Sequence, residues 1–297
     1  MWARAGVTVA AAVLALAAAA CAGDGDDGGT AASDEPATTS SASGGDFRAT
    51  LEDLCADLGD TTEAAQTAGS DAEFERRSRE LLDAQRSFVS EASMLTAPPS
   101  AADAYGEYLA GVERFVDLNE RSLAGVDDRR AELELGVEAA ENGVATFEAK
   151  QEAELPESCP PDADMYWFLF QTQANLACFE LSGDLARLGS FEEQTDTRAE
   201  TVALIALSRS LGAQHARAIE RSVPDELAEH PDVERLLELY EERVDALRRL
   251  GDAFSRPEEE AAYDRALERQ RRLTEEADEL AGRYGLGDCV GFVGVGG

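Results

Sequence analysis

The chain has 297 residues, and its 61 acidic against 26 basic side chains give a formal net charge of −35. A surface of that sign repels nucleic acid and anionic lipid, which excludes proteins that bind either by electrostatic attraction. Aromatic residues make up 6% of the chain and hydrophobic residues 44%, a composition that favours packed helices over an aromatic-rich β-sandwich core. Lys150 is the only lysine, which argues against Schiff-base and Ser-Lys catalysis.

The first 20 residues predict a signal peptide. Arg4 is their only charged side chain, and a 16-residue stretch of mostly Ala, Val and Leu follows from Ala5 to Ala20. A basic start, an apolar middle and small residues before the cleavage point are the marks of an export signal. The stretch is short for a membrane span, which needs about 20 strongly apolar residues. We therefore expect residues 1–20 to be removed and the rest of the chain to be exported.

Cys21 stands directly after the alanines that end this segment. The run Ala18-Ala19-Ala20-Cys21 resembles the lipobox of bacterial lipoproteins, in which the cysteine is diacylated and becomes the new N-terminus. The resemblance implies lipidation at Cys21 and a place on the outer face of the cell membrane, held by two or three acyl chains. The alternative is ordinary cleavage after Ala20, which releases a soluble protein with a free N-terminal thiol.

A segment without core-forming residues follows this cysteine. Residues 22–46 consist almost wholly of Gly, Ala, Ser, Thr and Asp, which is typical of flexible linkers. We predict a disordered tether over 21–46 and a disordered tail over 291–297.

Four cysteines remain for disulfides, and an internal repeat indicates how they pair. In each copy a cysteine in a leucine-rich pattern is followed after 43 or 46 residues by a proline between two amphipathic stretches. A second cysteine follows after a further 61 or 65 residues. The same signals at nearly equal spacing indicate a duplicated domain, so we predict that Cys55 is bonded to Cys159 and Cys178 to Cys289. A redox role is the alternative, although the chain has no Cys-x-x-Cys motif.

Apolar residues recur at helical spacing through the first copy. Alternating steps of three and four residues place them on stripes that turn signals separate. These stripes contain Phe47, Leu51, Leu54, Leu58, Phe74, Leu81, Phe88, Leu95, Tyr105, Tyr108, Val112, Phe115, Leu123, Leu133, Val137, Ala140, Val144, Phe147 and Leu155. They predict an antiparallel four-helix bundle over 47–161.

The second copy shows the same periodicity. Its stripes contain Trp167, Ala174, Cys178, Leu181, Leu185, Leu188, Leu204, Leu211, His215, Ala218, Val233, Leu236, Tyr240, Val244, Leu247, Tyr263, Ala266, Gln270, Leu273, Ala277, Leu280 and Tyr284. Ser255, followed by a proline and a glutamate, predicts the start of the last helix. We predict a second bundle over 162–290, and hence an all-α protein of two tandem antiparallel four-helix-bundle-like domains, each closed by one disulfide.

No motif specifies a catalytic or metal site. Glu-x-x-His, His-Glu-x-x-His, paired Cys-x-x-Cys and Gly-x-Ser-x-Gly are all lacking, so we predict no catalytic residue, no metal and no cofactor. His215 falls on an inward stripe, where we expect a buried histidine bonded to a neighbouring polar group, and His230 is expected in an exposed turn. For a small ligand, the candidate contacts are His215, Tyr240 and Trp167.

The layout of export signal, Gly/Ser/Thr/Asp tether and acidic helical ectodomain resembles that of many lipoproteins of high-GC Gram-positive, actinobacterial-type bacteria. The resemblance implies no activity. We expect a non-enzymatic, membrane-tethered interaction module whose partners are the membrane, through the lipid, and a cell-envelope protein, but not nucleic acid. The alternative is a helical-bundle lipoprotein that binds a small ligand or cation.

Overall fold

The computed structural model describes residues 44–126, 128–186, 198–255 and 260–290. The predicted signal peptide, Cys21, most of the predicted tether and the C-terminal tail lie outside these residues. Within them the protein is all-α, with eight α-helices, two 3-10 turns and no β-strand, which confirms the predicted fold class. The helices fall into two compact units that divide between Met165 and Tyr166.

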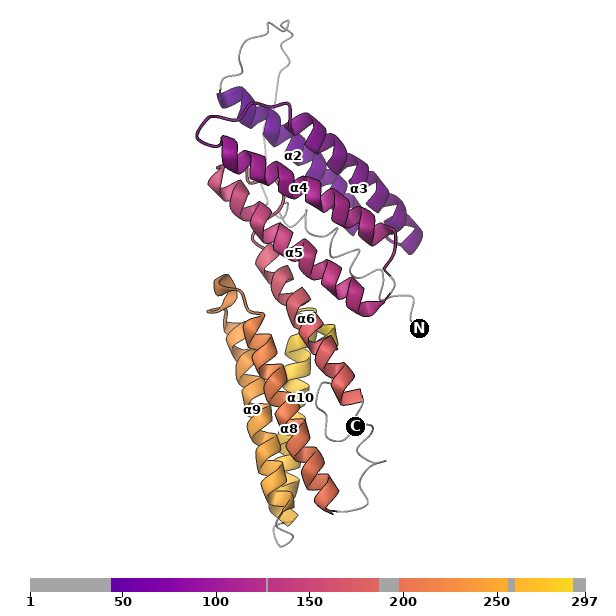
Figure 1. The fold of residues 1–297 in the computed structure, drawn as a ribbon, viewed down its shortest axis with the longest axis vertical. Helices are drawn as coiled ribbons and strands as arrows, with labels where there is room; N and C mark the ends of the chain where they lie inside the picture. Colours follow the sequence, from indigo (N-terminus) through magenta and orange to yellow (C-terminus); the bar gives the residue numbers. More distant parts are fainter. Residues whose placement is uncertain (1–43, 127, 187–197, 256–259, 291–297) are drawn as a thin grey trace, which may run out of the picture. The chain divides into compact units, whose positions relative to one another are not determined.

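The first unit contains four helices joined by short turns. They are α2 (Gly44–Gln66), α3 (Asp71–Ala92), α4 (Ala102–Leu123) and α5 (Arg129–Glu152). Each helix packs against the next one in the chain (Figure 1). Ser70 and Asp128 cap α3 and α5, because their side-chain oxygens accept hydrogen bonds from backbone N–H groups three residues later. Since α2 begins at Gly44, the last three residues of the predicted tether are helical instead.

The predicted stripes of α2, α3 and α4 meet in the core of this unit. The Tyr105 ring lies 5.1 Å from that of Phe47, edge to face, and its hydroxyl donates a hydrogen bond of 2.7 Å to the carbonyl of Ala92. A buried tyrosine with its hydroxyl satisfied in this way ties α4 to the end of α3. The buried residues of the three stripes include Phe47, Leu51, Leu58, Leu81, Phe88, Tyr105, Tyr108 and Val112.

The buried face of α5 agrees only in part with the predicted one: Leu133 and Ala140 are buried as predicted. Val137, Val144 and Phe147 are only half-buried. The buried residues of α5 are mostly small: Gly136, Ala139, Ala140, Gly143, Thr146 and Ala149 are among them. A Cβ atom on Gly111 of α4 would lie 2.1 Å from the hydroxyl oxygen of Thr146. The prediction was therefore wrong for these three large residues, because close backbone approach decides this interface.

Cys55 of α2 is bonded to Cys159, in the segment after α5, as predicted. Their Cα atoms are 4.6 Å apart, and both residues are fully buried. Lys150 holds the same segment, since its ammonium donates hydrogen bonds to the carbonyls of Glu157 (3.0 Å) and Pro161 (3.1 Å). Lys150 is 4% exposed, and burial lowers its pKa. The single lysine thus fixes the turn that carries the first disulfide.

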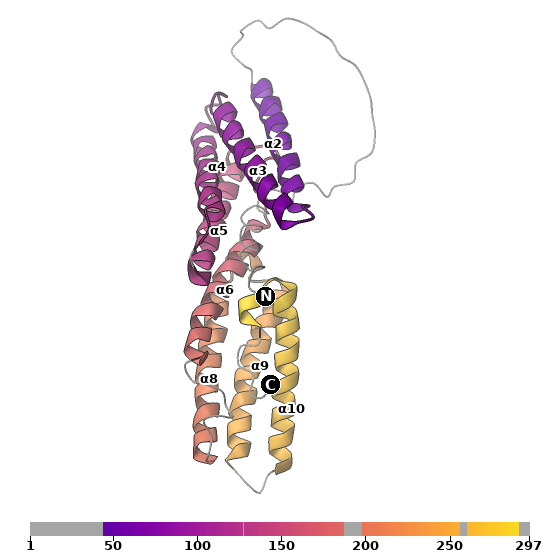
Figure 2. The ribbon, with the colours of Figure 1, turned by 90° about the vertical axis from the view of Figure 1, so that its right-hand side faces the viewer.

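The second unit contains four helices and two short turns. They are α6 (Met165–Ala186), α8 (Arg198–Arg221), η2 (Asp225–Leu227), α9 (Pro231–Phe254), α10 (Glu260–Arg283) and η3 (Gly287–Cys289). Helix α9 packs against both α8 and α10, and Figure 2 shows these three side by side. The predicted disulfide between Cys178 and Cys289 ties α6 to the turn after α10, with Cα atoms 5.1 Å apart.

Two helix ends in this unit differ from the prediction. Ser255 continues the hydrogen-bond ladder of α9, with its N–H 3.0 Å from the carbonyl of Gly251, so it ends α9 and does not start the last helix. The other residues of the predicted start, 256–259, lie outside the described residues. His230 is half-buried, not exposed, and caps α9, because its Nδ1 accepts a hydrogen bond of 3.3 Å from the N–H of Asp232.

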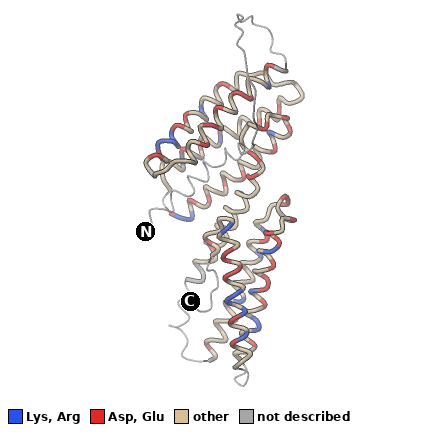
Figure 3. The backbone as a smooth tube through the Cα atoms, turned by 180° about the vertical axis from the view of Figure 1, so that it is seen from behind, with Lys and Arg blue, Asp and Glu red and all other residues tan. Residues whose placement is uncertain are grey.

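Acidic side chains are spread along the helices of both units (Figure 3). Residues 44–165 contain 29 acidic and 10 basic residues, so acids outnumber bases there almost three to one. The arginines pair mainly with acids one helical turn away, as Arg76 does with Glu80, and such exposed pairs contribute little to stability. None of the described helices is both long and apolar enough to cross a membrane.

Candidate functional site

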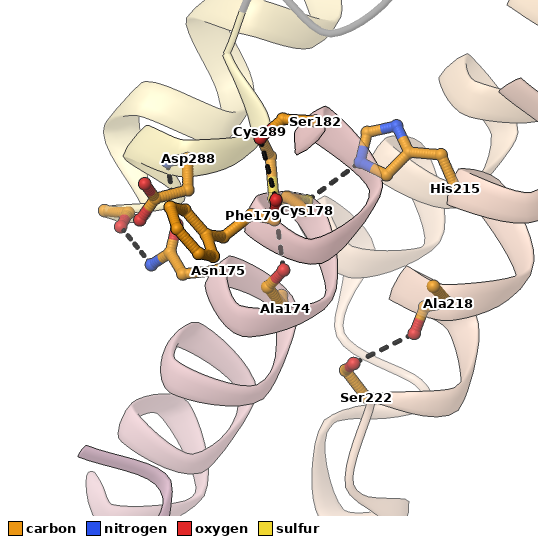
Figure 4. The surroundings of a disulfide bond; sticks show 11 residues. Ala174, Asn175, Cys178, Phe179, Ser182, His215, Ala218, Ser222, Asp288 and Cys289 are labelled. Carbon is orange, nitrogen blue, oxygen red and sulfur yellow. Dashed lines mark hydrogen bonds between the residues drawn. A yellow bond between two sulfur atoms is a disulfide. The ribbon is translucent and has the colours of Figure 1, made fainter. Parts of the chain in front are cut away.

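Three elements of the second unit bring Cys178, His215 and Cys289 together (Figure 4). Cys178 lies on the buried face of α6, His215 on that of α8, and Cys289 ends the turn η3. Their sulfur and ring-nitrogen atoms all lie within 4.8 Å of one another. The helical stripes placed Cys178 and His215 on inward faces, but periodicity along single helices gives no information on which residues of two helices meet.

His215 contacts the disulfide directly. Its Nε2 lies 2.8 Å from Sγ of Cys178. Since a disulfide sulfur carries no hydrogen, the histidine is the donor, and Nε2 bears the proton. Burial, assisted by the nearby charge of Arg243, lowers the pKa of His215 to about 3. The ring is therefore a neutral imidazole at physiological pH.

Two buried polar side chains of α9, Tyr240 and Arg243, lie close to His215. The Tyr240 ring lies 4.8 Å from that of His215, and the Arg243 guanidinium lies 5.4 Å from the centre of the Tyr240 ring. Burial raises the pKa of Tyr240 to about 12 and lowers that of Arg243. The Tyr240 hydroxyl and both amide atoms of Gln270 are buried without a hydrogen-bond partner among the described residues. Such groups mark a place for internal water or a small polar ligand.

Trp167 lies apart from the two other predicted ligand contacts. Its ring stacks on that of Tyr284, with centroids 4.7 Å apart and planes 8° apart, and the His230 ring meets it edge to face at 4.8 Å. Trp167 precedes Cys178, the neighbour of His215, by 11 residues of α6, which is about 16 Å along the helix axis. The structure thus brings His215 and Tyr240 together and places Trp167 in a separate aromatic cluster.

The first disulfide has no comparable surroundings. Both histidines of the chain belong to the second unit. Across the described ranges, Cys178, His215 and Cys289 form the one group of three His, Cys, Asp or Glu side chains close enough to hold a metal ion. A buried disulfide therefore closes each unit, but only the second disulfide has an imidazole against it.

A groove between α8 and α9 is the second candidate site in this unit. It encloses about 510 Å³. Its lining is partly apolar and partly acidic: Ala213, Ala216, Arg217 and Glu220 come from α8, and Glu234, Leu237, Glu238, Glu241 and Val244 come from α9. Glu238 pairs with Arg235 at 3.2 Å. Glu220, Glu234 and Glu241 form no ion pair with any described residue.

No protein-family model, curated protein or solved structure matches the chain. Its function must therefore be argued from these two sites and from the sequence.

Proposed function

We propose that the protein is a non-enzymatic, membrane-tethered extracytoplasmic binding protein, whose second unit receives a basic amphipathic segment of a cell-envelope protein. The observation that carries the proposal is the α8–α9 groove, where glutamates line the same hollow as half-buried apolar side chains. Negative charge and apolar surface side by side match a partner that is both basic and apolar.

The two disulfides support the extracytoplasmic part of this proposal. Both join residues more than 100 positions apart, and all four cysteines are fully buried. Bonds of this kind form and persist in oxidising compartments and are rare in the cytosol. Lipidation at Cys21 and attachment to the outer face of the membrane complete the proposal and rest on the lipobox resemblance.

The spacing of the groove glutamates defines the partner's chemistry. Glu234, Glu238 and Glu241 follow one another by four and three residues, which places them on one face of α9. Leu237 and Val244 supply the apolar contact from the same helix. A helical segment with Lys or Arg flanking an apolar stripe matches both features, as in other helix-in-groove complexes.

A designed peptide pair tests the groove. We expect a basic amphipathic peptide to bind the full chain in a fluorescence anisotropy titration, and a peptide with the same apolar residues but Glu in place of Lys not to bind. Replacing Glu234, Glu238 and Glu241 together by Gln should weaken binding by about tenfold, because each lost charge pair contributes on the order of 0.5 kcal/mol.

A second triple variant provides the control for net charge. Asp53, Asp57 and Asp60 have the same spacing on the exposed face of α2, which belongs to the first unit. Changing all three to Asn should leave peptide binding unchanged. If both triple variants weaken binding equally, the peptide is attracted by overall charge, and the proposed groove is wrong.

The alternative, a protein that binds a small ligand or cation, is favoured by the buried Tyr240 hydroxyl and Gln270 amide. A ligand that satisfies these groups should raise the thermal unfolding midpoint of the wild-type protein but not that of Gln270→Leu. If metals, haem and lipids all leave the wild-type midpoint unchanged, internal water explains the polar groups and this alternative is wrong.

A further inference from the structure

We propose that Cys178, Cys289 and His215 form a redox-gated site for a thiophilic cation, Cu⁺ or Zn²⁺, which fills when the second disulfide is reduced. In the oxidised state the two sulfurs are bonded to each other, so neither is a thiolate that can bind a metal. Reduction converts the same three side chains into two thiolates and an imidazole, the ligand set that copper(I) and zinc prefer in proteins.

The position of His215 is the first support for this site. Its Nε2 already lies 2.8 Å from a sulfur that would be a ligand, and the three ligand atoms lie within 4.8 Å of one another. After reduction the two sulfurs, bonded at 2.03 Å in the oxidised state, must separate to about 3.5–3.8 Å, the spacing of ligands around a metal ion with bonds of about 2.0–2.3 Å.

A comparison within the chain shows that the histidine is not required by a buried disulfide as such. Cys55 and Cys159 are as buried as Cys178 and Cys289, and they close a loop of similar length. The first unit nevertheless contains no histidine. Burying an imidazole carries a desolvation cost that an apolar side chain would avoid, which indicates a function for His215 beyond packing.

Asn175 keeps the two cysteines close after their bond is broken. Its side-chain amide donates to the carbonyl of Gly285 at 2.9 Å and accepts from the N–H of Asp288 at 3.0 Å. These two hydrogen bonds hold the turn that carries Cys289 against α6 independently of the disulfide. The reduced site is therefore preorganised, which lowers the entropic cost of gathering its ligands.

The chemical balance of the proposed step is simple. An external dithiol reductant supplies two electrons and two protons, becomes a disulfide itself and leaves Cys178 and Cys289 as thiols. Metal binding then releases both thiol protons. The proton on Nε2 of His215 moves to Nδ1 through solvent exchange, so that Nε2 presents its lone pair to the metal. Copper(I) is stable with these three ligands. Zinc binds four ligands, and a water molecule supplies the fourth.

Metal titration of the reduced full chain tests this proposal. The protein carries Cys21→Ala to remove the fifth thiol, is reduced with a phosphine under anaerobic conditions and is titrated separately with Co²⁺, Zn²⁺ and Cu⁺. We expect the second unit to bind one equivalent, with thiolate-to-cobalt charge-transfer bands for Co²⁺. The oxidised protein should show no such bands. Competition of Zn²⁺ and Cu⁺ with chelators of known affinity shows which of them the site prefers.

Three variants assign the site. His215→Gln keeps both cysteines and should weaken metal binding at least tenfold. Cys178→Ser with Cys289→Ser should abolish it, and Cys55→Ser with Cys159→Ser should leave it unchanged. Equal affinity in wild type and His215→Gln would overturn the proposal. So would a reduced wild-type protein that binds no metal, including one that loses the circular dichroism of its helices and does not regain it when Zn²⁺ or Cu⁺ is added.

Discussion

At position 215 the fold holds a neutral imidazole against a disulfide, in surroundings that resist its protonation. Tyr240 and Arg243 face it from α9 and Cys178 faces it from α6, while Asp278 of α10 acts on Arg243. Burial and the positive charge of Arg243 both disfavour the charged ring. The folded state therefore opposes protonation that the unfolded chain accepts freely.

This difference predicts a pH dependence of stability for the second unit. The pKa of His215 is about 3 in the folded state against 6.5 in the unfolded chain. Between these values the unfolded state binds the extra proton, so stability falls as the pH falls below 6.5. From pH 7 to pH 5 the loss from His215 should be about 2 kcal/mol. His215→Gln should remove this part of the pH dependence.

Urea unfolding of both proteins at pH 7 and pH 5, followed by the fluorescence of Trp167, measures the effect in the second unit. The only other tryptophan is Trp2, within the predicted signal peptide. An unchanged pH dependence in His215→Gln would show that His215 titrates normally.

At the residue scale, sequence reasoning placed His215 and Tyr240 on inward faces, where both lie, but could not tell that Trp167 lies elsewhere. The three residues share the inward stripes of different helices, and stripes specify which face is buried, not the level along the bundle at which two helices meet. The contact between His215 and the second disulfide was missed for the same reason. Combining the stripe of α6 with the disulfide pairing would have limited the candidates for a contact with the second disulfide to residues near Cys178.

At the scale of helices, small residues decide how closely α4 and α5 approach each other. Gly111 of α4 faces Thr146 of α5 at a distance that leaves no room for a methyl group. Gly143 of α5 similarly faces the sulfur of Met165, which a Cβ atom would approach to 2.2 Å. Glycine weakens an isolated helix, so its presence at these positions reflects packing.

A pair of alanine substitutions in α4 separates packing from helix propensity. Gly111→Ala should destabilise the first unit by about 1–3 kcal/mol, because overpacking outweighs the gain in helix propensity. Gly106→Ala, in the same helix, meets no atom within 4 Å and should stabilise the unit by up to about 1 kcal/mol. Hydrogen exchange of α4 peptides, measured by mass spectrometry, reports both effects. Slower exchange in Gly111→Ala than in wild type would contradict the packing argument.

The helices themselves were largely predictable, because the apolar stripes of α2, α3, α4 and α9 are regular and their large side chains form the core. The face of α5 was only partly predictable, because small residues carry little hydropathy signal although they make up most of its buried residues. The prediction that Ser255 starts the last helix was wrong for a different reason. Serine is common both as an N-cap and near helix ends, and only the backbone hydrogen bonds show which applies.

At the scale of the whole chain, the repeat in the sequence corresponds to two units, each closed by its own disulfide. The disulfide pairing could be predicted from the repeat, because the spacing of cysteines and prolines along the chain shows the repeat directly. The tether, the lipidation of Cys21 and the export of the protein stay predictions, since they concern residues outside the described part.

Removing one disulfide should therefore destabilise the unit that contains it. Cys55→Ala with Cys159→Ala should lower the stability of the first unit by about 2–5 kcal/mol, because the bond no longer restricts the unfolded chain. The Trp167 unfolding transition, which belongs to the second unit, should keep its midpoint. For Cys178→Ala with Cys289→Ala we expect the Trp167 midpoint to fall and the stability of the first unit to stay unchanged. A Trp167 midpoint that falls equally in both double variants would show that the two bonds stabilise one cooperative structure.

The burial of Lys150 has a practical consequence for finding the partner. With the chain's single lysine enclosed, reagents that acylate amines have no lysine to reach on the folded surface. Carbodiimide coupling, which joins a carboxylate to an amine, then works in one direction: this chain contributes the carboxylate and the other molecule contributes the amine. Every such conjugate formed on intact cells would identify a lysine of the neighbour, and the acidic residue at its other end would locate the contact.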